Sequence, residues 1–300
     1  MRPFRSLTIY IAVVFLGGAL LAPGLYWLAQ SAAAQFPSLQ KIADSPFHRY
    51  VNRSLLILAL AGLVPLLRNL GVTSWRDLGL GRPAAPQGRQ LLGGFLLGFA
   101  GLAVVVGIAL LGGGPIWNTH PAGTIVSKML SAALTAAVVA VLEEILFRGG
   151  IFGGLRRGFH WRFALGASSA VYALVHFLDR AKLDGAVTWH SGFDLLPQML
   201  RGFGNVEMLV PGFFSLALAG WVLGLAYQRT GNLYAAIGLH AGWIFWLKSY
   251  GFLTAAAPGA SAWFWGTHKL TDGWLAFFIL LLTLVLAEKF LWRQPTSRRV

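Results

Sequence analysis

Three charged side chains at the end of a long apolar stretch have the types and spacing of a catalytic site. Glu143 and Glu144 are adjacent, and Arg148 follows four residues after the second of them. On a helix, residues four apart lie on one face, so Glu144 can pair with Arg148 while Glu143 points about 100° away. A carboxylate paired with a guanidinium can hold the neighbouring side chains of a site in position, and a second carboxylate can act as a general base. The spacing therefore predicts different roles for the two glutamates.

Two histidines in other apolar stretches could complete this site. His176 and His240 each lie in a separate apolar run. Together with the glutamates, on three helices, they form the set that water activation and oxyanion stabilisation need. The same residue types could instead hold zinc, with Glu144, His176 and His240 as ligands and a fourth position open. The usual helical form of that zinc site, His-Glu-x-x-His, is absent from the sequence.

The composition predicts that these residues lie inside a membrane. Of the 300 residues, 56% are apolar and 11% are charged, and the mean hydropathy is +0.65. A charge at hydrocarbon depth costs about 2.5–3.5 kcal/mol, so an ionisable cluster there indicates a functional site by default. The alternative is a helix-end cluster whose side chains only extend to the interface. The sequence has no Cys, which excludes disulfides, thiolate metal ligands and a cysteine nucleophile.

Eight apolar runs predict an all-α fold, a polytopic membrane helix bundle with about eight transmembrane helices. One run, 55–67, is short and needs flanking residues to span. Another, 7–28, precedes Ser31-Ala32-Ala33-Ala34, which resembles a signal-peptidase site. Because that run is long for a signal segment, we expect it to remain as the first span. The predicted spans are 7–28, 55–67, 91–111, 127–148, 163–178, 209–227, 233–247 and 274–292.

The basic residues indicate orientation rather than a nucleic-acid partner. The formal charge of +14 comes mostly from Lys and Arg in the short connections between apolar runs. The connections on the side of both termini hold more of them, so we expect both termini to be cytoplasmic. Short loops and a bias toward Ala, Gly, Arg and Leu indicate a bacterial protein in the inner (cell) membrane. The expected partners are the lipid bilayer and a peptide or protein substrate, with or without a lipid anchor, and no nucleic acid.

The charged residues also resemble the motifs of a known family. Glu143-Glu144-Ile145-Leu146-Phe147-Arg148 matches the Glu-Glu-x-x-x-Arg motif of the CPBP family, the CAAX-protease and bacteriocin-processing endopeptidases, also called the ABI family. The stretch from Tyr172 to His176 is similar to its second motif, Phe-x-x-x-His, with Tyr in place of Phe. The stretch 220–240 resembles the hairpin that leads to its last motif, His-x-x-x-Asn. The resemblance covers about 127–247.

This resemblance implies an eight-helix intramembrane peptidase, a hydrolase of glutamic type that needs no cofactor and performs intramembrane proteolysis. By position, Glu143 and His176 would activate a water, Glu144 with Arg148 would brace the site, and His240 would help to stabilise the oxyanion. The chain would then divide into three parts. These are N-terminal helices with about three spans at 1–126, a catalytic core at 127–247, and an extramembrane loop, last span and basic tail at 248–300.

Two features of the sequence differ from what the family resemblance predicts for an active peptidase. Where the family often has Asn, four residues after the last His, this chain has Ile244, which cannot donate a hydrogen bond. Trp243 is the nearest indole N–H that could substitute. His176 also lies about 20 Å along its run, at about 1.5 Å per residue, deeper than Glu143 and His240, so the fifth helix must begin late or be displaced. A zinc-dependent peptidase, or a non-catalytic scaffold, immunity protein or transporter, therefore remain as alternatives.

Overall fold

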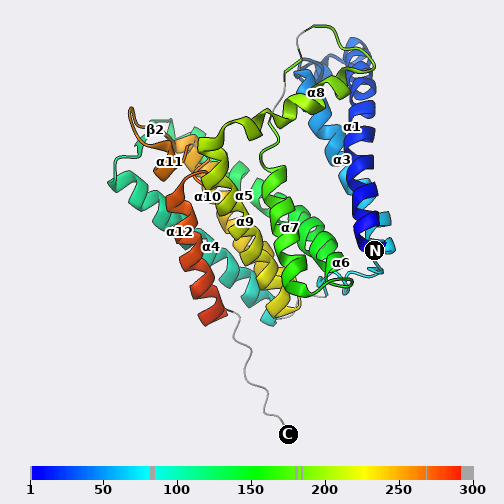
Figure 1. Ribbon diagram of the computed structural model, residues 1–300. Helices are drawn as coiled ribbons and strands as arrows, with labels where there is room; N and C mark the ends of the chain where they lie inside the picture. Colours follow the sequence, from blue (N-terminus) through cyan, green and yellow to red (C-terminus); the bar gives the residue numbers. More distant parts are fainter. Residues whose placement is uncertain (1, 82–84, 180–181, 184, 268, 292–300) are drawn as a thin grey trace. The chain divides into compact units, whose positions relative to one another are not determined.

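The computed structural model has the predicted all-α helix-bundle fold (Figure 1). It describes residues 2–81, 85–179, 182–183, 185–267 and 269–291. Five helical segments in this part of the chain are long and apolar enough to cross a membrane. Their bounds are Phe4–Gln35, Phe47–Asn69, Ala85–Leu111, Ala122–Leu155 and Val206–Thr230. The multi-pass membrane architecture is thus confirmed.

The three other predicted spans correspond to shorter or less apolar helices. The run 163–178 forms α7 (Trp161–Val175) and the run 233–247 forms α10 (Tyr234–Leu253). The last run forms α12 (Trp274–Leu286), which continues as the π-helical segment η4 (Ala287–Leu291). Its predicted end at Trp292 lies outside the described residues. A total of eight spans stays a prediction.

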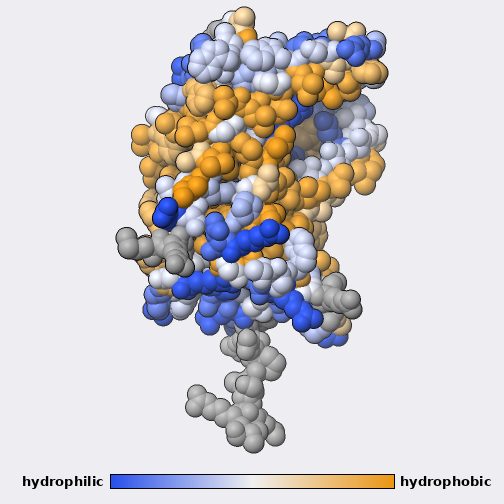
Figure 2. All heavy atoms as spheres, turned by 90° about the vertical axis from the view of Figure 1, so that its right-hand side faces the viewer, coloured by the Kyte–Doolittle hydropathy of each residue, from blue (hydrophilic) through white to orange (hydrophobic). Residues whose placement is uncertain are grey.

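The chain forms two compact units, each built from two separate stretches. Unit 1 comprises Met1–Thr73 and His176–Asn205, and unit 2 comprises Ser74–Val175 and Val206–Val300. Exposed apolar side chains cover wide areas of the surface, as expected where helices face lipid (Figure 2). On α5 (Ala122–Glu144), for example, they include Leu130 and Leu134, which are both 68% exposed.

Unit 1 is a helical hairpin with a short helix packed across it. Its elements are α1 (Arg2–Gln35), η1 (Pro37–Leu39), α2 (Gln40–Ala43), α3 (Phe47–Asn69), α8 (Ser191–Met199) and η3 (Leu200–Gly204). A Cβ at Gly192 of α8 would lie 1.9 Å from the carbonyl oxygen of Ala19, so only glycine allows α8 to approach α1 this closely. The core beneath α8 contains Phe47, Val51 and Leu195.

Unit 2 contains the remaining helices, of which α9 lies beside α10 and α12 (Figure 1), and a small two-stranded sheet. The sheet pairs β1 with β2 in antiparallel register, with Pro115 opposite Ala256. Gly231 has the positive φ of +69° that a helix C-terminal cap requires, so α9 turns directly into α10 as the sequence predicts. The elements are α4 (Ala85–Leu111), β1 (Pro115–Trp117), α5, η2 (Ile145–Phe152), α6 (Gly153–Leu155), α7, α9 (Val206–Thr230), α10, β2 (Thr254–Ala256), α11 (Ala262–Trp265), α12 and η4.

Glycines spaced four apart hold α4 directly against α10. A Cβ at Gly98 would lie 2.3 Å from the carbonyl oxygen of Leu239, and one at Gly242 would lie 2.6 Å from that of Phe95. Gly94 and Gly238 make the same close approach one turn earlier on each helix. Small residues at this spacing allow membrane helices to pack backbone against backbone. The contact fixes the height and rotation of α10, the helix that carries His240.

We expect Gly98→Ala to lower the thermal unfolding midpoint of the protein in detergent. The new methyl group has no space, and overpacking of this kind costs about 1–3 kcal/mol. Gly107→Ala on the same helix is the matched control, because a Cβ there meets nothing within 4 Å. Since alanine favours helix more than glycine, the control should leave the midpoint unchanged or raise it. Equal midpoints for the two variants would show that the α4–α10 approach is not tight.

Candidate active site

The helix that carries the three charged residues continues beyond Arg148. α5 runs into the π-helical segment η2 and then into α6 without a break, ending at Leu155. The sequence predicted that this helix ends at Arg148, and that expectation is wrong. Glu143 and Glu144 therefore lie about 12 residues, or about 18 Å, from the helix end. π-Helical turns are rare and occur often at functional sites.

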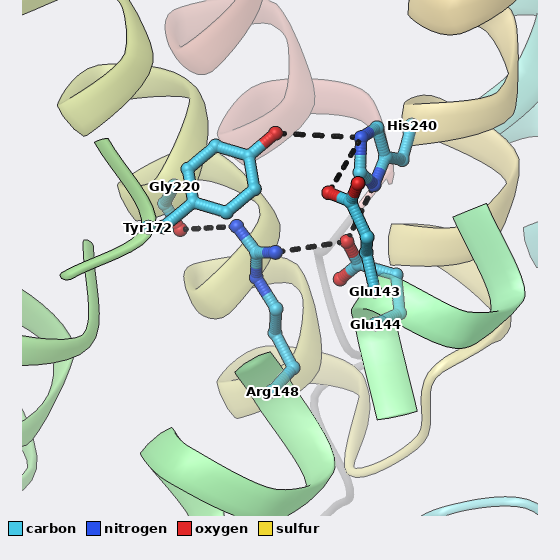
Figure 3. A network of polar contacts seen from close by, with 6 residues as sticks. All are labelled: Glu143, Glu144, Arg148, Tyr172, Gly220 and His240. Atoms are coloured by element: carbon cyan, nitrogen blue, oxygen red, sulfur yellow. Dashed lines mark hydrogen bonds and ion pairs between the residues drawn. The ribbon is translucent and has the colours of Figure 1, made fainter. Parts of the chain in front are cut away.

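Glu144 is the centre of a buried polar network that joins α5 and η2 to α7, α9 and α10 (Figure 3). Its Oε1 accepts a hydrogen bond from Arg148 Nη1 at 2.9 Å, which is the pairing that the spacing predicts. The same oxygen accepts a second hydrogen bond from His240 Nδ1 at 2.7 Å. Glu144 is 0% exposed and Arg148 2%. These side chains do not extend to the interface, so the helix-end alternative is wrong for both.

Arg148 is held on two sides besides its ion pair. Its Nη2 donates to the backbone carbonyl of Gly220 on α9 at 3.3 Å. Its guanidinium carbon lies 4.5 Å from the centre of the Tyr172 ring, in cation–π geometry. Gly220 also lets α9 approach α7, because a Cβ there would lie 3.0 Å from Ser169 Cα. The close α7–α9 contact thus brings both groups within reach of one guanidinium.

His240 connects the two glutamates. A carboxylate only accepts hydrogen bonds, so the short contact with Glu144 assigns a proton to Nδ1. The other ring nitrogen, Nε2, lies 3.8 Å from Glu143 Oε2 and 3.4 Å from the Tyr172 hydroxyl. Figure 3 shows Glu143 and Tyr172 on the same side of the imidazole. Nε2 is therefore the nitrogen that can take part in chemistry.

The two glutamates differ in their surroundings as the spacing predicts. The Glu143 side chain is 28% exposed, whereas that of Glu144 is 0% exposed. Glu143 Oε2 is itself buried, and among the described residues it has no hydrogen-bond partner. A buried carboxylate oxygen normally finds a partner, which can be a water or a ligand. Glu143 can therefore hold a water beside His240 Nε2.

Within unit 2 the structure brings together four of the predicted residues and adds one that was not a candidate. Glu144 contacts Arg148 and His240, and His240 also lies beside Glu143. His176 is the first residue after α7 and is assigned to unit 1. The residue of α7 that contacts His240 is Tyr172, four residues earlier. α7 begins at Trp161, so the first of the two explanations for the depth of His176, a late helix start, is wrong, and a displaced helix stays a prediction.

The side chains offer little to a metal ion as they stand. In the part of the chain that the structure describes, no three His, Cys, Asp or Glu side chains have a metal-binding arrangement. Two of the three ligands in the zinc alternative, Glu144 and His240, are hydrogen-bonded to each other. Glu144 Oε1 and His240 Nδ1 are used in this contact, so zinc would have to bind Glu144 Oε2 and His240 Nε2 to leave the network intact.

Removing the guanidinium should destabilise the protein strongly. Arg148→Met leaves a buried carboxylate without its cation, and breaking a buried pair from one side costs about 3–5 kcal/mol. The double variant Arg148→Met with Glu144→Gln should recover part of that loss, because it removes the unpaired charge. Arg229→Met is the control, since the Arg229–Glu288 pair is exposed and contributes about 1 kcal/mol or less. Similar unfolding midpoints for Arg148→Met and Arg229→Met would contradict this expectation.

Comparison with known proteins supports the motif resemblance over the same region. Residues 125–246 match the family model described as type II CAAX prenyl endopeptidase, Rce1-like. Comparisons with curated proteins and with solved structures gave no match. The matched range contains every residue of the buried network, from Glu143 to His240. Residues 125–246 are therefore similar to the Rce1-like type II CAAX prenyl endopeptidases, in agreement with the motifs of the CPBP/CAAX protease family.

Proposed function

We propose that the protein is a glutamic-type intramembrane endopeptidase in which Glu143 activates a water molecule. The observation that carries the proposal is the buried Glu143 Oε2, which has no hydrogen-bond partner among the described residues and faces His240 Nε2 at 3.8 Å. A water held by both atoms would lie between a base and an imidazole. The Rce1-like match supports a peptide bond as the target of that water.

The steps follow from what each side chain can donate or accept. Glu143 takes a proton from the water, and the resulting hydroxide attacks the carbonyl carbon of the peptide bond. The carbonyl oxygen becomes an oxyanion that His240 stabilises from Nε2. Glu143 then returns the proton to the leaving nitrogen, and the C–N bond breaks. Glu144 and Arg148 keep the imidazole in place, since both of their charges are used within the network.

His176 is part of the proposed mechanism because it belongs to the second motif of the family resemblance. By that resemblance it would share the activation of the water with Glu143. His176→Gln tests this role directly, and we expect a loss of turnover comparable to that of a missing general base, about 10²–10⁴-fold. Full activity of this variant would remove His176 from the mechanism and leave Glu143 as the base.

The proposed substrate is a membrane-associated peptide, with or without a lipid anchor, that reaches the site within the bilayer. The matched family is described by its action on prenylated proteins, which makes an S-farnesylated C-terminal peptide the first probe to use. A non-prenylated apolar peptide of the same sequence tests whether the lipid is needed. The activity is assigned to the core 127–247, with 1–126 and 248–300 as flanking helices and loops.

Replacing Glu143 should abolish cleavage of these probes. Glu143→Gln keeps the size of the side chain but removes the base, so turnover should fall at least about 10²–10⁴-fold. Glu207→Gln, at an exposed glutamate in the first turn of α9, is the matched control and should retain wild-type turnover. The readout is release of a quenched fluorophore from each probe by purified protein in detergent.

The same assay separates the alternatives. Unchanged turnover in Glu143→Gln would contradict the glutamate mechanism. Loss of activity with a chelator and recovery with added Zn²⁺ would favour the zinc-dependent peptidase. Ile244, which is buried one turn after His240 and cannot donate a hydrogen bond, is the observation that favours a non-catalytic scaffold or immunity protein. That reading predicts no cleavage by wild-type protein with either probe.

We further propose a bacterial inner membrane location with both termini on the cytoplasmic side. The support is the excess of Lys and Arg in the connections on that side. Because the chain has no Cys, single cysteines can be introduced without background labelling. A membrane-impermeant maleimide added to intact cells should label a cysteine at position 118 but not one at position 159. The reverse pattern would contradict the orientation.

A further inference from the structure

The hydroxyl of Tyr172 has no role in the steps above, although it lies at the reacting nitrogen. We propose that Tyr172 is a further catalytic residue, whose O–H donates a hydrogen bond to the oxyanion alongside His240 Nε2. The proposal rests on the proposed peptidase function and extends it to the group that stabilises the tetrahedral intermediate. Tyr172 remains protonated throughout, so it adds a hydrogen bond and transfers no proton.

The position of the hydroxyl is the first argument. Tyr172 is 3% exposed, and its hydroxyl oxygen lies 3.4 Å from His240 Nε2. That distance is long for a hydrogen bond between oxygen and nitrogen, so little is lost when the contact is replaced. Two donors 3.4 Å apart can both lie about 2.8 Å from a single oxygen, with an angle of about 75° between them. The two atoms therefore have the spacing of a two-donor oxyanion site.

The surroundings of the ring are the second argument. The Arg148 guanidinium carbon lies 4.5 Å from the ring centre, and the Phe147 ring packs edge-on at 5.0 Å. A cation against the face of a phenol draws electron density from it and makes its O–H a stronger donor. The guanidinium is itself fixed by Glu144 and the Gly220 carbonyl. The donor is thus polarised and held in place before substrate binds, as electrostatic stabilisation requires.

The charge of the cluster is the third argument. With the second nitrogen of His240 protonated, two carboxylates face two cations, Arg148 and the imidazolium, and the group has no net charge. When Glu143 takes the water proton it becomes neutral, so its negative charge moves to the oxyanion and the net charge of the buried site stays the same. A neutral hydroxyl donor can stabilise that charge without adding a further buried cation. Ile244, on the His240 helix, supplies no such donor.

Trp243 is the competing donor. Its indole N–H is buried, and in the described part of the chain it has no acceptor. It lies one turn after His240 on the same helix. The structure places the Tyr172 hydroxyl 3.4 Å from His240 Nε2, which favours the tyrosine. The variants Tyr172→Phe and Trp243→Phe, tested in parallel, show which of the two donors acts.

The test compares Tyr172→Phe with Tyr227→Phe on whichever farnesylated or non-prenylated probe wild-type protein cleaves. Each variant removes one buried hydroxyl and keeps the ring, but the Tyr227 hydroxyl contacts Arg156 at 3.2 Å, away from the network. Loss of one oxyanion donor lowers turnover by about 10²–10³-fold. We expect this fall in kcat for Tyr172→Phe with little change in KM, and wild-type kinetics for Tyr227→Phe.

A second measurement separates a catalytic role from a structural one. A phosphonamidate analogue of the cleaved probe imitates the tetrahedral intermediate, and Tyr172→Phe should weaken its inhibition by the same factor as kcat/KM. A non-cleavable ground-state peptide should bind wild type and variant equally. The loss should also persist in a His240→Ala background, because the hydroxyl contacts the substrate oxygen itself.

The outcomes are distinct. Unchanged kcat in Tyr172→Phe, a loss that disappears in the His240→Ala background, or a fall in Trp243→Phe instead would each overturn the role of Tyr172 and leave the peptidase intact. Failure of wild-type protein to cleave any probe would contradict the proposed function, and this inference with it.

Discussion

A single carboxylate oxygen, Glu144 Oε1, is the atom on which the rest of the site depends. It accepts hydrogen bonds from Arg148 and from His240 while the residue is fully buried. A buried carboxylate is tolerated only when it is paired and hydrogen-bonded, so both partners must be present and in place. This requirement ties α5 and η2 to α10, and Arg148 extends it to α9 through the carbonyl of Gly220. Glu143 Oε2 thereby lies 3.8 Å from Nε2 and has no hydrogen-bond partner among the described residues.

Neighbouring helix backbones must lie close to one another for such short side-chain contacts to form. Gly98 and Gly242 let α4 press against α10, and Gly220 and Gly224 let α7 press against α9. Lipid tails are as apolar as the helix surfaces, so the hydrophobic effect does not favour one helix pairing over another. The packing of small residues and the buried polar contacts must therefore position the helices. The glycines and the charged network are therefore parts of one arrangement. The glycines set the distances between the helices, and Glu144 fixes which faces meet.

The sequence predicted the local part of this arrangement better than the tertiary part. The pairing of Glu144 with Arg148 follows from helical spacing alone, and the motif order predicted His240. Tyr172 was noticed only as a substitution for Phe, although its added hydroxyl was a signal that it could do chemistry. The rotation and height of α7, which bring Tyr172 to His240, depend on its contact with Gly220. The predicted span 127–148 stops before the helix end at Leu155, because a charged residue such as Arg148 indicates a membrane boundary from sequence alone, whereas the structure buries it.

We propose that substrate peptide binds at the Glu143–His240 network of unit 2. Photo-crosslinking tests it most directly, with a benzoylphenylalanine placed next to the scissile bond of the probe peptide and mass spectrometry of the linked fragments. We expect crosslinks to residues within 139–148, 168–175 and 240–247, and these crosslinks should be lost when excess phosphonamidate analogue is added. Crosslinks confined to residues 1–73, or unaffected by the analogue, would contradict it.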